Sequence, residues 1–169
     1  MELTIHELLA YLDEERSKWE RWFSMQGNAP LKIPTGGETH PTLGALIMHC
    51  FWTELWYAYM LSGQVLTRES DVIKENINVP NDRSDAVFDF GRKARNAMNS
   101  FVARASEAVW KQVHALPPPW QKFTGSARKL TFHVLMHEIR HWAQISMAVR
   151  QNNLTPPGEH DLMFSRALE

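Results

Sequence analysis

Apolar residues recur every three or four positions along four long stretches of the chain, which is the period of an amphipathic helix. The first stretch opens at Thr4 and runs to about residue 26, and Thr4 with Glu7 forms the pattern of a capping box. The second begins near Thr42 and ends near Gly63, a residue type that is common just past a helix C-terminus.

The later part of the chain contains the other two predicted helices. Ser84 is a suitable cap for the third, which is expected to run to about His114, because the proline run at 117–119 cannot continue a helix. The fourth is expected from about Ser126 to Gln151. Residues 63–83 are mixed and polar and are predicted to be loop, the tail after 154 has room for one short helix, and no segment alternates like a strand.

Four long helices with short-to-medium connections predict an all-α four-helix bundle with a short C-terminal segment. The 169 residues are expected to form a single domain over 1–169, which is long enough to bury a sizeable core without disulfides. Seven tryptophans predict thick aromatic packing, an apolar pocket, or both.

Composition excludes several classes of protein. A net charge of −1 gives no electrostatic basis for binding nucleic acid, so no nucleic-acid partner is expected. No stretch approaches the ~18 uncharged apolar residues of a membrane span, and the acidic N-terminal stretch does not resemble a signal peptide. A single cysteine cannot form an internal disulfide, which fits a reducing compartment, and we expect a cytoplasmic protein that acts on a small molecule.

Candidate chemistry gathers in the stretch HVLMHEIRH, where His133, His137 and His141 follow one another at four-residue steps. Four residues is close to one helical turn, so the three imidazoles project from one side of the fourth helix. Imidazole is the commonest protein ligand for zinc, nickel and similar metals. This spacing favours one wall of a metal site over three histidines buried for packing alone.

A further ligand is needed from elsewhere, because catalytic zinc sites use three protein ligands and leave one position open. His49 is the best candidate, since it lies in the second helix on a side shared with Ala45, Trp52 and Trp56. By itself, a histidine among such apolar residues is more often a core residue. The several histidines of the fourth predicted helix reverse that preference here.

The same stretch satisfies H-E-x-x-H, the signature of zinc proteases, in which Glu138 would be the general base. Glu159 or His160 could then supply a third ligand, but only 28 residues follow the motif and no strand-rich segment precedes it. A protease is therefore the weaker interpretation, and Glu138 is expected behind the ligands or at the surface. Glu54 is expected to orient His49, pair with an arginine or face solvent.

Cys50 directly follows His49 in the chain. Adjacent helical residues point about 100° apart, so Cys50 is not expected to bind the same ion as its neighbour. A buried free cysteine is the simpler interpretation.

Three segments of the sequence, TLGALIMHCFWTE, HVLMHEIRHWAQI and TPPGEHDLMF, together resemble the DinB / YfiT-like superfamily of metal-dependent enzymes. The resemblance implies an up-down-down-up four-helix bundle, frequently a homodimer, with a divalent metal ion that is often zinc or nickel. It places the metal ligands at His49, His137 and His141. His133 matches a family position that is not usually a ligand.

The sequence departs from the family after the last of these ligands. Members commonly continue with Arg-Gly-Gln, whereas His141 is followed here by Trp142, Ala143 and Gln144. This puts in doubt any role of that arginine and leaves the three ligand positions intact.

The resemblance also implies an activity. Relatives include thiol S-transferases and a thiol-dependent isomerase that use low-molecular-weight thiols, so the leading hypothesis is a metal-dependent thiol S-transferase, with a hydrolase next. No residue can be named as the general acid or base. A non-catalytic metal or small-ligand binding protein, and a structural homodimer with a vacant site, are the alternatives.

Overall fold

The computed structural model of the chain describes residues 3–116, 119–158 and 165–167. Four long helices pack against one another, which confirms the all-α bundle. They are α1 (Ile5–Gln26), α2 (Leu43–Leu61), α4 (Ser84–Arg104) and α6 (Ala127–Gln151). The smaller elements are the 3₁₀ helix η1 (Ala29–Lys32), α3 (Asp71–Asn76), α5 (Glu107–Lys111) and the strands β1 (Val113–Ala115) and β2 (Thr124–Ser126).

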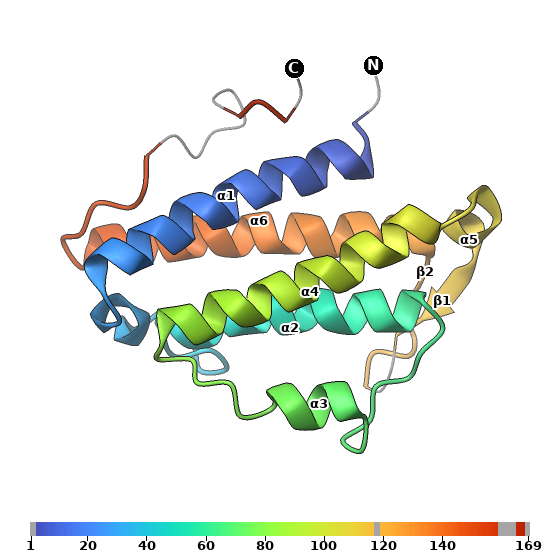
Figure 1. The fold of residues 1–169 in the computed structure, drawn as a ribbon, viewed down its shortest axis with the longest axis horizontal. Helices are drawn as coiled ribbons and strands as arrows, with labels where there is room; N and C mark the ends of the chain where they lie inside the picture. The colour runs from blue at the N-terminus through green and yellow to red at the C-terminus, as the bar shows by residue number, and fades with distance from the viewer. Residues whose placement is uncertain (1–2, 117–118, 159–164, 168–169) are drawn as a thin grey trace.

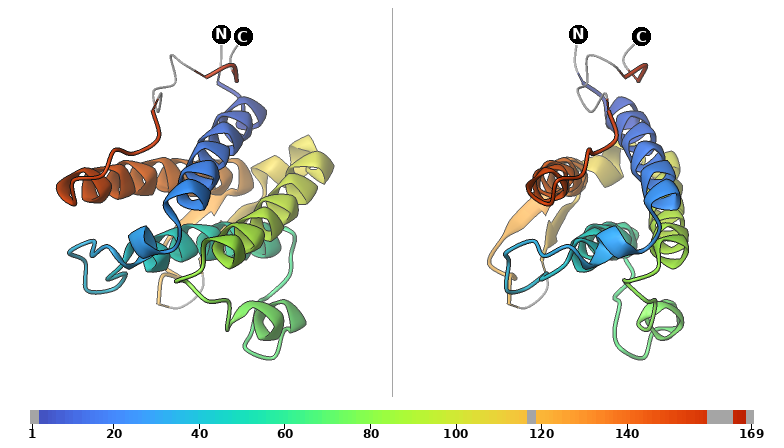
Figure 2. Two further views of the ribbon diagram at one scale, coloured as in Figure 1. Left: turned by 60° about the vertical axis from the view of Figure 1, so that its left-hand side comes forward. Right: turned by 90° about the vertical axis from the view of Figure 1, so that its left-hand side faces the viewer.

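The four long helices have an up-down-down-up arrangement. Figure 1 shows α1 and α6 running in one direction and α2 and α4 in the other, and Figure 2 shows them from two further sides. Because α2 and α4 are parallel, a long connection that contains α3 must return the chain from the end of one to the start of the other. α2 packs against both α4 and α6, and α1 contacts the same two helices.

Local hydrogen bonds explain where the helices begin. The predicted capping box is present, with Glu7 N donating to Thr4 Oγ1 at 3.2 Å and Thr4 N donating to Glu7 Oε2 at 2.7 Å. Thr42 and Ser126 cap α2 and α6 by accepting from backbone N–H groups three residues later. These caps place the first turns of α2 and α6, the two helices that carry the histidines.

The predicted third helix is wrong at both ends. It ends at Arg104 rather than near His114, because Ala105 is extended and Ser106 caps a separate helix, α5. At its start, Ser84 is the first helical residue and does not provide a side-chain cap. Its N–H and hydroxyl instead donate to Asn28 Oδ1 at 2.9 and 3.0 Å, so a side chain distant in sequence satisfies this end.

Two short features differ from the loops that were predicted. Residues 63–83 contain α3, and the connection after α5 forms the antiparallel pair β1–β2. Each strand has three residues, which is too short for hydrophobic alternation to be recognised in sequence. The tail was expected to have room for one short helix; its described residues, 155–158 and 165–167, are not helical, and residues 159–164 lie outside the described part of the chain.

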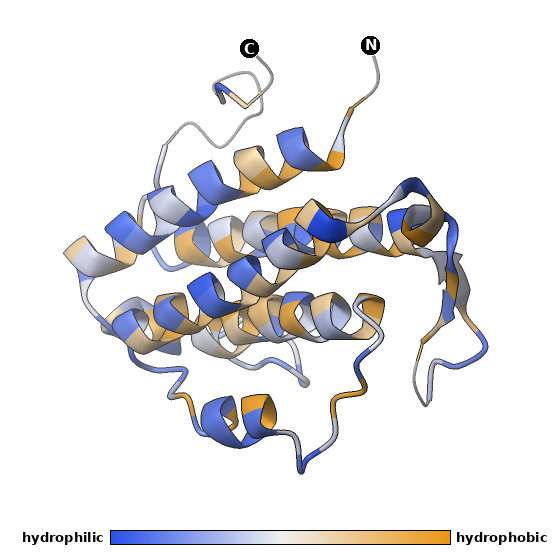
Figure 3. Ribbon diagram, turned by 45° about the vertical axis from the view of Figure 1, so that its right-hand side comes forward, coloured by the Kyte–Doolittle hydropathy of each residue, from blue (hydrophilic) through white to orange (hydrophobic). Residues whose placement is uncertain are grey.

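Aromatic side chains fill the bundle. Trp19 and Trp142 are buried and stack with their ring centroids 5.4 Å apart, which joins α1 to α6. Figure 3 shows hydrophobic and hydrophilic residues alternating around α1 and α4, as expected for helices with one buried side. No helix in the described ranges is long and apolar enough to cross a membrane.

Candidate metal centre

Three histidines from two helices meet between α2 and α6. His49 Nε2 lies 3.3 Å from His137 Nε2, and His141 Nε2 lies 3.0 Å from the same atom. One ligand nitrogen from each of the three lies within 4.8 Å of the other two. The residues that the sequence and the resemblance indicated are therefore brought together as one cluster.

The helices determine this geometry. His137 and His141 are one turn apart on α6, and their ring centroids are 4.3 Å apart. α2 packs against α6 and presents His49, whose ring centroid is 5.1 Å from that of His137 and 5.2 Å from that of His141. Residues 88 positions apart in sequence thus form one group of donors.

A hydrogen bond sets the tautomer of His141. Its Nδ1 lies 2.6 Å from Gln144 Oε1, an oxygen that can only accept. Nδ1–H is therefore the donor, and the hydrogen bond directs Nε2 toward the other two histidines. Metal-binding histidines are commonly oriented in this way by a hydrogen bond to the other ring nitrogen.

Two histidines of the cluster, His49 and His137, are held in the neutral form at pH 7. Burial, followed by the neighbouring histidines, lowers the pKa of His49 to about 4. The pKa of His137 is also lowered to about 4, by burial and then by His141 and His49. Neutral imidazoles keep the lone pairs that a metal requires.

These donors fit a divalent ion. Nitrogen atoms bound to one tetrahedral ion at ~2.0–2.1 Å are about 3.3–3.4 Å apart, close to the two separations observed. An ion at this position would be bound by three neutral side chains from two packed helices.

Two further histidines lie beside the cluster without belonging to it. The ring of His40 stacks on that of His49, with the centroids 4.0 Å apart, and Thr35 Oγ1 donates to the backbone oxygen of His40 at 2.5 Å. His133, one turn before His137, has its ring centroid 6.2 Å away and faces Tyr57. Sequence reasoning did not single out His40, because a loop histidine has no helical spacing to place it.

The position of Glu138 argues against the interpretation of the motif as that of a zinc protease. It is buried on another side of α6, where it accepts hydrogen bonds from Arg16 Nε at 2.6 Å, Arg95 Nη2 at 3.1 Å and Trp142 Nε1 at 3.0 Å. Burial opposes its ionisation, but Arg16 and Arg95 hold the pKa of Glu138 below its usual value. A carboxylate bound by two guanidinium groups is not available as a general base.

The same buried network accounts for two other residues. Glu54 is buried and pairs with Arg16 at 2.6 Å and Arg95 at 3.3 Å, which selects the arginine-pairing role among those expected. The Cys50 thiol is buried, donates to the backbone oxygen of Leu46 at 3.2 Å and has its pKa raised by burial. The simpler interpretation of Cys50 is confirmed.

A cavity of about 600 Å³ opens directly beside the histidine cluster. Its lining combines α2, α6 and the connection after β1. The described lining residues are Trp52, Thr53, Trp56, Tyr57, Leu116, Trp120, His133 and His137. His137 belongs to both the cluster and the cavity wall, so a molecule in the cavity would be next to the candidate metal site.

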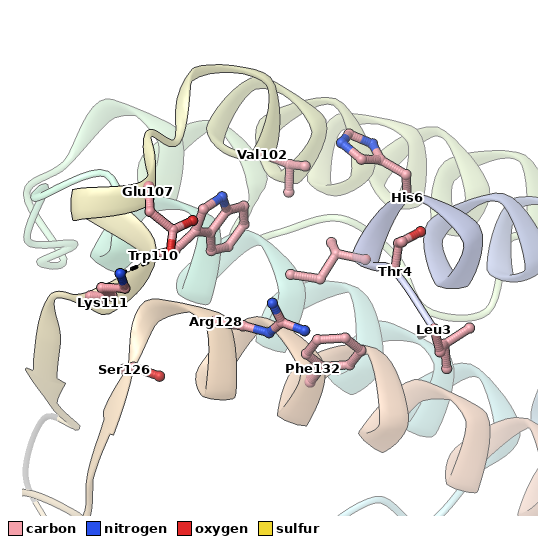
Figure 4. A pocket seen from close by; sticks show the side chains of 11 residues that line it. Leu3, Thr4, His6, Val102, Glu107, Trp110, Lys111, Ser126, Arg128 and Phe132 are labelled. Carbon is pink, nitrogen blue, oxygen red and sulfur yellow. Dashed lines mark ion pairs between the residues drawn. The ribbon is translucent and has the colours of Figure 1, made fainter. Parts of the chain in front are cut away.

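A second cavity, of about 570 Å³, lies between the start of α1, α5 and the start of α6 and shares no residue with the cluster. Figure 4 shows that charged side chains line it, including Lys111, Arg128 and Glu107. Lys111 pairs with Glu107 at 3.1 Å, and Arg128 lies over the ring of Phe132. Cationic and anionic groups thus occur in this cavity but not along the described walls of the first.

Comparison with known proteins identifies the family. The sequence model of the DinB family matches residues 1–167, nearly the whole chain. No curated protein matches it. Together with the three-histidine cluster between α2 and α6, this match is consistent with the fold of a metal-dependent enzyme. The chain therefore belongs to the DinB family.

Proposed function

We propose that this protein is a metal-dependent enzyme that transfers a low-molecular-weight thiol to an electrophilic small molecule. In this proposal His49, His137 and His141 hold one divalent ion, zinc or nickel. The observation that supports it most is the convergence of three histidine Nε2 atoms at the edge of a large apolar cavity.

The donor set suits this chemistry. A divalent ion held by three neutral ligands keeps its full positive charge and would lower the pKa of a thiol or a water molecule bound at its open position. The roles of the protein are then to position the donors and to shape the space beside them. Gln144 fixes the orientation of His141, and Trp52 and Trp56 form an apolar wall of the cavity beside the cluster.

Thiol transfer is preferred to hydrolysis because of where the carboxylates are. Glu138 and Glu54 are the acidic residues nearest the ligands in sequence, and both are paired with arginines. No Asp or Glu occurs among the described residues of the aromatic cavity. A deprotonated thiol is a strong nucleophile without an adjacent base, whereas hydrolysis usually relies on one.

The proposed reaction is a substitution at carbon. A sulfur–carbon bond forms, the bond to the leaving group breaks, and the leaving group departs with its electron pair. The thiol proton passes to solvent. No oxidant or reductant is consumed.

The remaining expectations belong to the same proposal. We propose a cytoplasmic homodimer that binds neither nucleic acid nor membrane. Light scattering of purified protein tests the dimer, and an electrophoretic shift with duplex DNA at physiological salt would contradict the exclusion of nucleic acid.

Thiol-transfer activity tests the proposal directly. Protein loaded with zinc or nickel would be mixed with glutathione, bacillithiol or mycothiol and 1-chloro-2,4-dinitrobenzene, and the thioether product followed by absorbance. We expect saturable turnover with at least one thiol, lost in His137→Ala and kept in Trp110→Ala, a matched variant at the second cavity. Equal rates for the wild type and His137→Ala, or turnover of a nitrophenyl ester without any thiol transfer, would overturn it.

A further inference from the structure

The cavity beside the histidine cluster has walls suited to a flat apolar molecule. Trp52, Trp56 and Tyr57 line it from α2, and Trp120 and Leu116 line it from the connection after β1. Its volume of about 600 Å³ lies within the range of sites for drug-sized ligands. Indole and phenol rings present large faces on which another aromatic ring can stack.

The polar groups in this cavity are neutral. The phenol of Tyr57 is uncharged at pH 7, and burial raises its pKa further. Thr53 uses its hydroxyl to donate to the backbone oxygen of His49 at 2.7 Å. The described lining contains no Lys, Arg, Asp or Glu. A carboxylate or ammonium group placed against these walls, away from the ion proposed at the histidine cluster, would lose its hydration without gaining a partner, which is costly.

Comparison with the second cavity makes the absence of charged side chains from the first cavity informative. At nearly the same volume it is lined by Lys111, Arg128 and Glu107 (Figure 4), so a charged lining is compatible with this bundle. The cavity that touches the candidate metal ligands is the one without charge.

We infer that this cavity binds the electrophile, and that the electrophile is an uncharged aromatic molecule stacked against Trp52, Trp56 and Trp120. The inference rests on the proposed function in one respect, that the bound molecule reacts at the histidine cluster. Thiols such as glutathione carry carboxylates and do not suit these walls. The cavity is therefore the site of the electrophile, and the thiol occupies separate space.

Binding of unreactive probes tests the substrate class without requiring turnover. 1,3-Dinitrobenzene and 3,5-dinitrobenzoate share a flat ring and differ in one carboxylate, and their affinities would be measured by isothermal titration calorimetry on metal-free protein, because a carboxylate can bind a metal ion directly. We expect the neutral probe to bind at least tenfold more tightly. Equal or tighter binding of the benzoate would overturn the inference.

Two tryptophan variants test where the neutral probe binds. Trp120 is 57% exposed, so Trp120→Ala should leave the fold intact and weaken binding of dinitrobenzene about fivefold or more. Trp110→Ala, at the second cavity, should leave that affinity unchanged. An equal loss of affinity in both variants would overturn the assignment. A change in the molecular mass of Trp120→Ala, measured by light scattering, would also overturn it, because it would show that a second copy of the chain covers the cavity.

The test separates this inference from the proposed function. Tight, tryptophan-dependent binding of the neutral probe without thiol turnover would remove the proposed reaction and keep the aromatic site. Turnover that favours an anionic electrophile, such as 4-chloro-3,5-dinitrobenzoate, over its neutral counterpart would keep the reaction and remove the inferred substrate class.

Discussion

Neighbouring residues of α6 contribute to two polar clusters with opposite properties, one partly buried and the other buried. His137 and His141 meet His49 on one side of the helix, whereas Glu138 and Trp142 face the core on another. In the second cluster, guanidinium and carboxylate groups pair at 2.6–3.3 Å. In the first, no charge compensates another, and three imidazole rings lie next to one another.

This contrast separates a structural role from a chemical one. Charges that pair within the protein join helices and need nothing further, and here they connect α1, α2, α4 and α6. Three nitrogen lone pairs that converge gain little from one another and require a proton or a metal. The motif H-E-x-x-H spans both clusters, which is why its glutamate and its histidines must be interpreted separately.

The largest effect is expected from breaking the charged cluster. Glu138→Gln would leave Arg16 and Arg95 underpaired in the core, and we expect a loss of about 3–5 kcal/mol in the free energy of unfolding. Urea denaturation measures it. Glu107→Gln, at an exposed ion pair with Lys111, is the control and should change stability by no more than about 0.5 kcal/mol.

His137→Ala in metal-free protein sharpens the comparison with Glu138→Gln. It removes a partly buried base that makes no compensating ion pair, so its loss of stability should be well below that of Glu138→Gln. A His137→Ala variant as unstable as Glu138→Gln would contradict the division of roles between the two clusters.

A smaller effect is expected from the hydrogen bond that orients His141. Gln144→Ala removes the acceptor of His141 Nδ1, which should weaken zinc affinity by about 10- to 100-fold without changing the fold. Competition with a chromophoric chelator measures the affinity. Restored affinity in Gln144→Glu would support the role of an acceptor, and unchanged affinity in Gln144→Ala would exclude it.

The smallest predicted effect concerns pH. The pKa values of His49 and His137 are about 4 in the folded protein and near the usual 6.5 in the unfolded chain, so the unfolded state binds more protons between these values. Metal-free protein should therefore lose stability as pH falls from about 6.5 to about 4, and protonation of these two groups should cause no further loss below that.

Solvent screening reduces the size of this pH effect, because both rings are partly exposed, and we expect about 1–2 kcal/mol in total. Urea denaturation at several pH values measures it. The variant with both His49→Ala and His137→Ala should show a flatter profile over this range, and an unchanged slope would contradict the assignment.

Much of the fold could be predicted because the signals are local. Helical periodicity and the caps Thr4 and Ser126 lie within a few residues of the boundaries they mark. The end of α4 could not be predicted, because the helix stops before Ala105 without a proline or glycine to mark its end. The partner of Ser84 is Asn28, which is 56 residues away, and only the folded chain brings them together.

The candidate site was predictable in part for the same reason. Helical spacing relates His137 to His141, and His49 was indicated by its position in the second helix and then by the resemblance to the family. The side of α6 occupied by Glu138 depends on Arg16 and Arg95 from two other helices, so no local pattern reveals it. The stacking of His40 on His49 depends likewise on the path of a loop.

Metal content tests the central claim most directly. Untagged protein purified without chelator would be analysed for its elements beside His49→Ala, His137→Ala and the control His133→Ala. The account predicts about one zinc or nickel ion per chain in the wild type and in His133→Ala, and none in the other two variants. A wild type that stays free of metal after incubation with zinc or nickel, or a His137→Ala variant that keeps a full complement, would contradict the three-histidine site.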